Sequence, residues 1–112
     1  MNRTITVRRD ECGCIKAQPV YQYNRGHILR LEGFNLPEDW DLDLSNSQTG
    51  DAITVHGSGN TAQLPEALLQ AGTSVYCWIT CRNAAGRLTK DYFLIPVIRR
   101  AQLPAGQEQT SN

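Results

Sequence analysis

Short runs of alternating apolar and polar residues, each ending near a glycine or proline, fill most of the chain from His27 onward. Alternation sends successive side chains to opposite faces, so each run predicts a β-strand followed by a turn. The clearest runs are His27–Gly33, Trp40–Ser45, Ala52–His56, Val75–Cys81 and Tyr92–Ile98. Thr4–Val7 and Thr61–Leu64 show the same pattern. Pro19–Tyr23 predicts a short edge strand, because proline cannot donate to a strand ladder.

Two of these runs predict different positions in a sheet. In Trp40–Ser45, tryptophan and leucine alternate with aspartate, which predicts a half-exposed strand with one apolar and one acidic face. Val75–Cys81 is apolar on both faces, as expected for a central strand. Leu88–Ile98 follows as its partner, and Pro96 predicts a bulge or a change from central to edge register.

Roughly seven or eight short strands with regular turns predict an all-β fold, an immunoglobulin-like antiparallel β-sandwich. One short connecting helix is predicted over Leu64–Gly72, with proline near its first position and glycine at its end. The 112 residues suffice for one domain, predicted over 1–104 and followed by a flexible polar tail at 105–112. The expected core consists of Leu29, Leu31, Leu42, Val75, Cys77, Ile79, Leu94 and Val97.

Composition and charge argue against two classes of function. Eleven Lys and Arg balance eleven Asp and Glu, so the basic excess of a dedicated nucleic-acid binder is missing. No uncharged apolar stretch approaches the roughly 18 residues that span a bilayer, and no apolar leader is present, so neither membrane insertion nor secretion is predicted. Residues 1–30 are basic, 31–72 acidic and 73–112 basic. We expect these strands to face one another within one fold; a dipolar module that stacks on an oppositely charged partner is the alternative.

Four cysteines raise the question of a metal site. Cys12-Gly13-Cys14 and the pair Cys77 and Cys81 both lack the two-residue spacing of a structural zinc knuckle. On an extended strand, Cys77 and Cys81 would lie about 13 Å apart at ~3.3 Å per residue, too far to share an ion or a disulfide. We therefore expect free thiols, no metal and no cofactor, with zinc held by two pairs from separate strands as the alternative.

Neither calcium binding nor catalysis is predicted. Asp39–Ser45 begins like a calcium loop, but Leu44 stands at the sixth position, where such a loop needs glycine. His27 and His56 are the two histidines, and no serine or cysteine nucleophile stands in a recognisable motif. An enzyme would require a cleft that holds one of these histidines beside a carboxylate.

Binding residues are sought among aromatic side chains and polar loops. Tyr21, Tyr23 and Trp40 could form a sugar-stacking platform, although aromatic residues in small sandwiches more often pack in the core or at an edge. The loops Gly57–Asn60 and Asn83–Gly86 are the most polar connections. The candidate interaction residues are Tyr21, Tyr23, Trp40, Gly57, Ser58, Asn60, Asn83 and Arg87.

Four landmarks carry a family resemblance. The segment from Tyr23 to Pro37 is followed by Ser45-Asn46 with Asp51-Ala52, then by Leu64–Gly72, and finally by Ile95-Pro96-Val97-Ile98-Arg99-Arg100-Ala101. In this order they resemble a module of tailed-phage structural proteins from Gram-positive hosts. The module is similar to the N-terminal domain of baseplate upper proteins and to phage head-fibre modules. The resemblance covers residues 21–104 and includes no catalytic motif.

The resemblance implies a non-enzymatic immunoglobulin-like sandwich that fastens a fibre or receptor-binding device to the virion. Its partners would be other virion proteins, with self-association and a host surface glycan left open, and the protein would be made in the host bacterial cytoplasm. Longer members continue into a linker and a distal domain where this chain stops, so we expect a free-standing virion component or an adaptor. A carbohydrate-binding module that recognises the host cell envelope is the alternative function.

Overall fold

The computed structural model describes residues 3–83 and 86–102, and most of these lie in β-strands. The strands are β1 Thr4–Arg9, β2 Ile15–Ala17, β3 Val20–Tyr21, β4 Ile28–Glu32, β5 Trp40–Ser45, β6 Ile53–His56, β7 Thr61–Gln63, β8 Val75–Asn83, β9 Gly86–Ile95 and β10 Val97–Ile98. A 3₁₀ helix, η1, covers Glu66–Leu69. The all-β prediction is confirmed, whereas the predicted tail at 105–112 lies outside the described residues.

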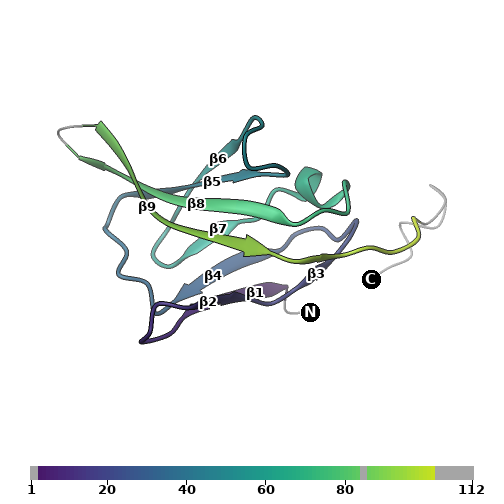
Figure 1. The fold of residues 1–112 in the computed structure, drawn as a ribbon, viewed down its shortest axis with the longest axis horizontal. Coiled ribbons are helices and arrows are strands. Elements are labelled where there is room, and N and C mark those ends of the chain that lie inside the picture. Colours follow the sequence, from purple (N-terminus) through teal and green to yellow (C-terminus); the bar gives the residue numbers. More distant parts are fainter. Residues whose placement is uncertain (1–2, 84–85, 103–112) are drawn as a thin grey trace.

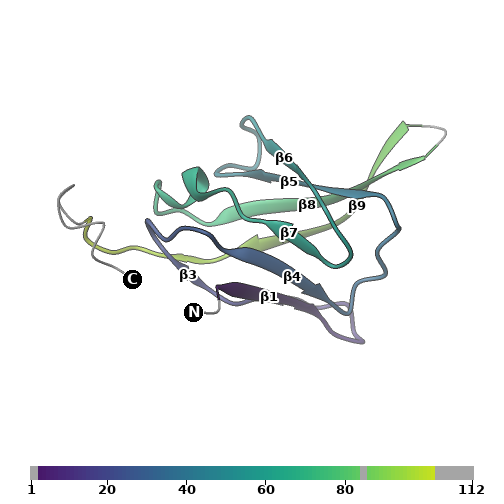
Figure 2. The same cartoon turned by 180° about the vertical axis from the view of Figure 1, so that it is seen from behind.

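Two four-stranded sheets form the body of the fold (Figure 1). The first sheet has the order β2-β1-β4-β7 and the second has the order β6-β5-β8-β9. Strands β10 and β3 make a separate two-stranded pair. Figure 2 shows the same two layers from behind, with β7, β4 and β1 in succession.

The predicted antiparallel arrangement of seven or eight strands needs two corrections. Ten strands are present in the described residues, because β2 (Ile15–Ala17) was not predicted and the predicted run Leu88–Ile98 divides at Pro96 into β9 and β10. Strand β1 pairs with β4 in parallel, and β10 pairs with β3 in parallel. The second sheet is antiparallel throughout. The parallel pairs join segments separated by other strands, so local alternation along the chain carries no sign of them.

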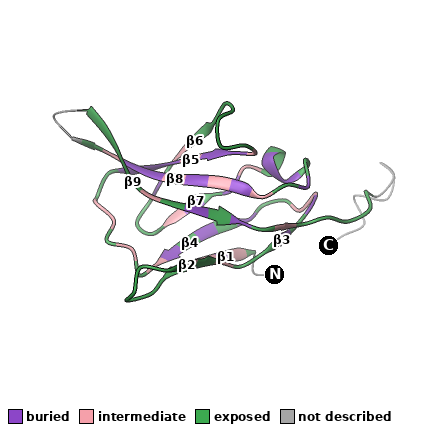
Figure 3. Ribbon diagram, viewed as in Figure 1, coloured by how far each residue is buried: buried purple, intermediate pink, exposed green. Residues whose placement is uncertain are grey.

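The buried faces of the two sheets meet in one hydrophobic core (Figure 3). Alternate residues of the longer strands point into it, as in Leu29 and Leu31 of β4 or Val75, Cys77 and Ile79 of β8. The members with 0% exposure come from both sheets: Val7, Leu29, Leu42, Leu44, Val75, Cys77, Ile79 and Ile95. Six of the eight predicted core residues are confirmed, namely Leu29, Leu31, Leu42, Val75, Cys77 and Ile79.

The other two predicted core residues, Leu94 of β9 and Val97 of β10, are not fully buried. Cys77 lies opposite Phe93 and Val75 lies opposite Ile95, so Phe93 and Ile95 are the residues of β9 that reach the core. Leu94 therefore points to the outer face, where its side chain is 42% exposed. Val97 is half-buried. The prediction for Leu94 is wrong because it placed this strand one residue out of phase.

Pro96 marks a change of sheet. Strand β9 ends at Ile95, and the chain then pairs through β10 with β3. The amide of Val20 donates to the Pro96 carbonyl at 3.0 Å, and the amide of Gln22 donates to the Ile98 carbonyl at 2.8 Å. The predicted bulge or change from a central to an edge position at Pro96 is therefore wrong, because β9 is already the edge strand of its sheet and the chain leaves that sheet at Pro96. The central position of β8, which lies between β5 and β9, is confirmed.

The predicted helix over Leu64–Gly72 is shorter than expected. Only Glu66–Leu69 is helical, and the turn is 3₁₀. Leu68 and Leu69 are buried, so this turn closes one end of the core. No helix within the described ranges is long and apolar enough to cross a membrane.

Candidate interaction surface

Charged, hydroxyl and aromatic side chains of the described residues lie together on the outer face of the second sheet. Strand register decides which residues meet there. Asp43 lies opposite Trp78 on β8 and Thr54 on β6. Asp41 lies opposite Thr80 on β8 and His56 on β6. Since residues that are directly opposite share a face, β5 presents its aspartates beside the aromatic and hydroxyl side chains of β8.

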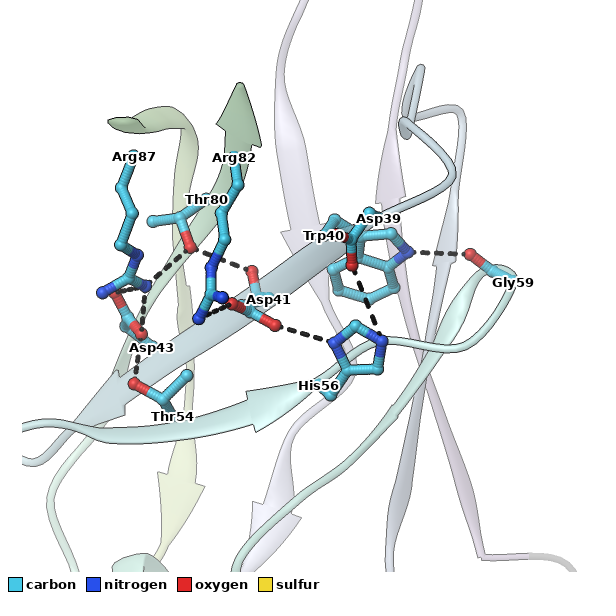
Figure 4. A network of polar contacts seen from close by, with 10 residues as sticks. All are labelled: Asp39, Trp40, Asp41, Asp43, Thr54, His56, Gly59, Thr80, Arg82 and Arg87. Carbon is cyan, nitrogen blue, oxygen red and sulfur yellow. Dashed lines mark hydrogen bonds and ion pairs between the residues drawn. The ribbon is translucent and has the colours of Figure 1, made fainter. Parts of the chain in front are cut away.

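A polar network surrounds Asp43 (Figure 4). Arg87 Nη2 donates to Oδ2 of Asp43 at 3.0 Å and to Oδ1 at 3.1 Å. The Thr54 hydroxyl donates to Oδ1 at 2.6 Å, and Arg87 Nη2 also donates to the Thr80 hydroxyl at 2.9 Å. One guanidinium thus links β9 to β5 and β8, and it fixes the carboxylate in one orientation.

Asp41 is the more buried of the two carboxylates, with 10% of its side chain exposed. Its Oδ1 lies 2.9 Å from His56 Nδ1, and its Oδ2 lies 3.5 Å from Arg82 Nη2. His56 Nε2 lies 3.7 Å from Asp39 Oδ1, so this ring stands between two carboxylates. The expectation of an exposed acidic face is wrong for Asp41, because the side chains of Arg82 and His56 lie against its carboxylate and cover it.

These ion pairs account for the segregation of charge along the sequence. Carboxylates of the acidic segment are matched by arginines of the basic segments: Asp41 by Arg82, and Asp43 by Arg87. In the first sheet, Arg8 Nη2 lies 2.6 Å from Glu32 Oε1. The hydrogen bond from Arg8 holds the pKa of Glu32 below its usual range. The described residues therefore favour the expectation that acidic and basic strands face one another within one fold.

An aromatic cluster lies on the same face, and it consists of Tyr76 and Trp78 of β8 with Tyr92 of β9. Ring centroids are 5.6 Å apart for Trp78 and Tyr92, and 6.4 Å apart for Tyr76 with each of the other two rings. Tyr92 is 40% exposed, and Leu94 beside the cluster is 42% exposed. Tyr76 and Trp78 are half-buried. The sheet thus offers apolar rings to solvent next to a fixed charged network.

Trp40 does not belong to this surface. It is 1% exposed, packs in the core, and donates from Nε1 to the Gly59 carbonyl at 2.9 Å. Trp40 shares the buried side of β5 with Leu42 and Leu44, so it is not part of the sugar-stacking platform considered for it, and the core packing weighed against that platform is confirmed. Tyr21 is 53% exposed on β3, and Tyr23 is half-buried with a φ of 70° beside a small polar pocket. The three predicted aromatic residues therefore do not form one platform.

The loop Gly57–Asn60 supports the core as much as it faces solvent. Gly57 is buried, and a Cβ at this position would lie 2.1 Å from Cε2 of the Trp40 ring. Asn60 Nδ2 donates to the Leu31 carbonyl at 3.3 Å. Ser58 is exposed, and its backbone pairs with Thr61. Within this loop, Ser58 and Asn60 are exposed, whereas Gly57 packs against the Trp40 ring.

We expect Gly57→Ala to lower the free energy of unfolding by about 1–3 kcal/mol, because the added methyl group overlaps a ring that cannot retreat within the core. Urea denaturation followed by circular dichroism measures the loss. Ser58→Ala is the matched control in the same loop and should change stability by less than about 0.5 kcal/mol. Equal losses in the two variants would contradict the contact between Gly57 and Trp40.

The second predicted loop is described only in part. Asn83 ends β8, where its backbone pairs with Gly86 of β9, and residues 84 and 85 lie outside the described residues. Arg87, which follows Gly86 in β9, belongs to the network around Asp43. The role of this loop in binding stays a prediction.

The two histidines take different places. His27 is 9% exposed; its Nδ1 lies 2.9 Å from the Arg3 carbonyl and its Nε2 lies 3.0 Å from Asn24 Nδ2, so both ring nitrogens are occupied. His56 lies beside Asp41 on an open sheet face. Among residues 3–83 and 86–102, no group of three or more metal-ligating side chains comes together. All four cysteines are free.

Tyr76, Trp78 and Tyr92 are the binding candidates that sequence reasoning missed. The signal was present in Val75–Cys81: the residues in phase with Cys77 and Ile79 belong to the core, so the residues between them face outward. Treating both faces of this strand as apolar hid the distinction. Compared with protein-family models, with curated proteins and with solved structures, the chain shows no match.

Proposed function

We propose that the protein is a non-enzymatic structural or adhesion module of a tailed-phage virion, a component of the head fibre or of the tail or baseplate. It acts through protein–protein contacts with other virion proteins. The fold is immunoglobulin-like in this proposal, and two facing four-stranded sheets with a shared core support that reading. The family resemblance of residues 21–104 supports the virion location.

The observation that carries the proposal is the outer face of the second sheet. Tyr76, Trp78 and Tyr92 lie together there, beside the ion pair of Arg87 and Asp43. Tyrosine, tryptophan and arginine are the residues most enriched where protein interfaces have their largest binding energies. Because Arg87 is already oriented by Asp43 and Thr80, little side-chain freedom is lost when a partner binds.

Rebinding to particles tests this function. Particles from a phage with the gene deleted are incubated with the purified protein, and occupancy is measured by quantitative mass spectrometry. We expect the native protein to rebind and Trp78→Ala to bind about 30-fold more weakly, which corresponds to about 2 kcal/mol for a central aromatic residue. Tyr21→Ala, an equally simple truncation of an exposed ring outside the second sheet, should bind as the native protein does.

Two results would contradict the proposal. If Tyr21→Ala weakens rebinding and Trp78→Ala does not, the binding surface is not the outer face of the second sheet. If the deleted phage assembles complete particles that adsorb normally, while DNA replication or lysis fails, the protein is not a structural component of the virion.

The aromatic cluster also favours a second candidate, a carbohydrate-binding module that recognises the host cell envelope. Aromatic rings stack on the apolar faces of sugars, and the neighbouring Asp43 and Arg87 can exchange hydrogen bonds with hydroxyl groups. A glycan array and a pull-down with protease-treated cell walls test this candidate. Retention of the native protein and loss of Trp78→Ala from such walls would favour the carbohydrate, whereas binding to particles alone favours the protein contact.

A further inference from the structure

The Cys12-Gly13-Cys14 segment joins two strands of the first sheet and has no part in the proposed function. It forms the turn between β1 and β2. Cys12 and Cys14 are both exposed, whereas Cys77 is buried and Cys81 is half-buried. Free cysteine is among the most frequently buried residue types, and exposed thiols are the ones that soluble reagents reach. Two exposed thiols one residue apart are therefore an unusual feature of this surface.

The turn holds the two cysteines close together. Asp10 Oδ1 accepts the amide hydrogens of both Cys12 and Cys14, each at 2.9 Å. Two amides that share one acceptor oxygen cannot lie farther apart than twice that distance. The shared acceptor therefore holds the backbones of the two cysteines close together, as a disulfide with its roughly 4.4–6.8 Å between Cα atoms requires. The backbone bond from the Asp10 amide to the Cys14 carbonyl, at 2.9 Å, closes the turn from the other side.

Gly13 supplies the bend between the two cysteines. Its φ is 89°, in the left-handed region that residues with a Cβ rarely adopt. Its amide donates to the Asp10 carbonyl at 3.0 Å. The reversal of the chain at Gly13 keeps both neighbouring cysteines on one tight turn.

We propose that Cys12 and Cys14 form a reversible thiol–disulfide exchange site that reacts with low-molecular-weight disulfides and closes into an intramolecular Cys12–Cys14 disulfide. The inference is independent of the binding partner proposed above. It concerns the first sheet, and it requires only that the folded chain meet a disulfide in solution.

The exchange is balanced in two steps. The thiolate of one cysteine attacks a sulfur of the small disulfide, so a mixed disulfide forms and one small thiol leaves. The thiolate of the second cysteine then attacks the protein sulfur of that mixed bond, so the ring closes and a second small thiol leaves. The two cysteines are oxidised, the two sulfurs of the reagent are reduced, and the two protons pass to the released thiols.

The position of the pair decides in which environment the bond forms. Exposed or strained disulfides have more oxidising potentials than buried structural ones. The pair should therefore be reduced in a bacterial cytosol and oxidised in an extracellular medium. The buried Cys77 should not react in this way, since burial raises the pKa of its thiol well above its ordinary range and keeps it protonated.

The experiment treats the reduced full-length chain with oxidised glutathione under exclusion of oxygen, and it follows the intact mass after acid quenching. We expect a product that has lost two hydrogen atoms and carries no glutathione, with the bond located between Cys12 and Cys14 by peptide mapping. Cys12→Ser and Cys14→Ser should each stop at a stable adduct with one glutathione. Cys81→Ser should close the bond as the native chain does.

A second pair of variants tests the part played by the turn. Asp10→Ala should slow ring closure about tenfold, which corresponds to about 1.4 kcal/mol for the lost amide contacts. Glu11→Ala removes a neighbouring carboxylate without touching these contacts and should leave the rate unchanged. The proposal is overturned if the native chain keeps glutathione, links to a second chain, forms a bond that includes Cys81, or stays reduced.

Discussion

Trp40→Ala is expected to lower the free energy of unfolding by about 3–5 kcal/mol. The Trp40 ring is 1% exposed, lies against Gly57, and donates to the Gly59 carbonyl at 2.9 Å. Truncation therefore leaves a large cavity between the sheets and an unpaired carbonyl in the loop that follows β6. Urea denaturation followed by circular dichroism measures the loss, and the fluorescence of Trp78 gives a second probe of the same transition.

Two other tryptophan variants serve as controls for this result. Trp40→Phe retains an aromatic ring but lacks the indole N–H, so its loss should be smaller than that of Trp40→Ala. Trp78→Ala truncates the same type of residue on the outer face of the second sheet, where the ring is half-buried, and it should cost less than either. A loss for Trp78→Ala that equals the loss for Trp40→Ala would mean that the two faces of the sheet have been exchanged.

Ile79→Ala is expected to cost about 2–5 kcal/mol. Ile79 is 0% exposed in the central strand β8, where it lies opposite Leu42 of β5. Every atom removed leaves a void with little opportunity to collapse, since both neighbouring strands hold the backbone in place. The change in urea midpoint at constant slope measures the loss.

The matched control for Ile79 is Ile53→Ala, which makes the same substitution in the edge strand β6. Ile53 is 41% exposed, so its loss should be below about 1 kcal/mol. A loss below about 0.5 kcal/mol for Ile79→Ala would show that β8 does not present this residue to the core.

Strand positions were largely predictable because alternation is a local property. Trp40–Ser45 is observed with the bounds predicted for it, and Val75–Cys81 lies within β8. The parallel pairing of β1 with β4 was not predictable in this way, because it depends on contacts between segments that are distant along the chain. The three-residue strand β2 was missed because Ile15–Ala17 is too short to show a period.

The binding surface shows the limit of reasoning from residue type. Trp40 was named as a candidate because an aromatic ring can stack on a sugar, although its phase with Leu42 and Leu44 already indicated burial. Trp78 has the opposite phase to its neighbours Cys77 and Ile79, and it lies outside the core. The phase of an aromatic residue within its strand predicts its exposure better than its type does. The arginines that pair with Asp41 and Asp43 could not be predicted from the sequence around these aspartates, because they come from other strands.

The passage of the chain from β9 to β10 at Pro96 has a mechanical meaning. A pulling force applied to the chain after Arg100 would first meet the hydrogen bonds from Val20 to Pro96 and from Gln22 to Ile98. Strand β10 runs parallel to β3, so a force along the axis of β10, with β3 held by the rest of the fold, loads these bonds in shear. The Gln22 side chain adds a further attachment, since its Oε1 accepts the Arg100 amide at 3.1 Å. A force applied at this end of the chain is therefore carried by the β3–β10 pair, which lies outside the two sheets that enclose the core.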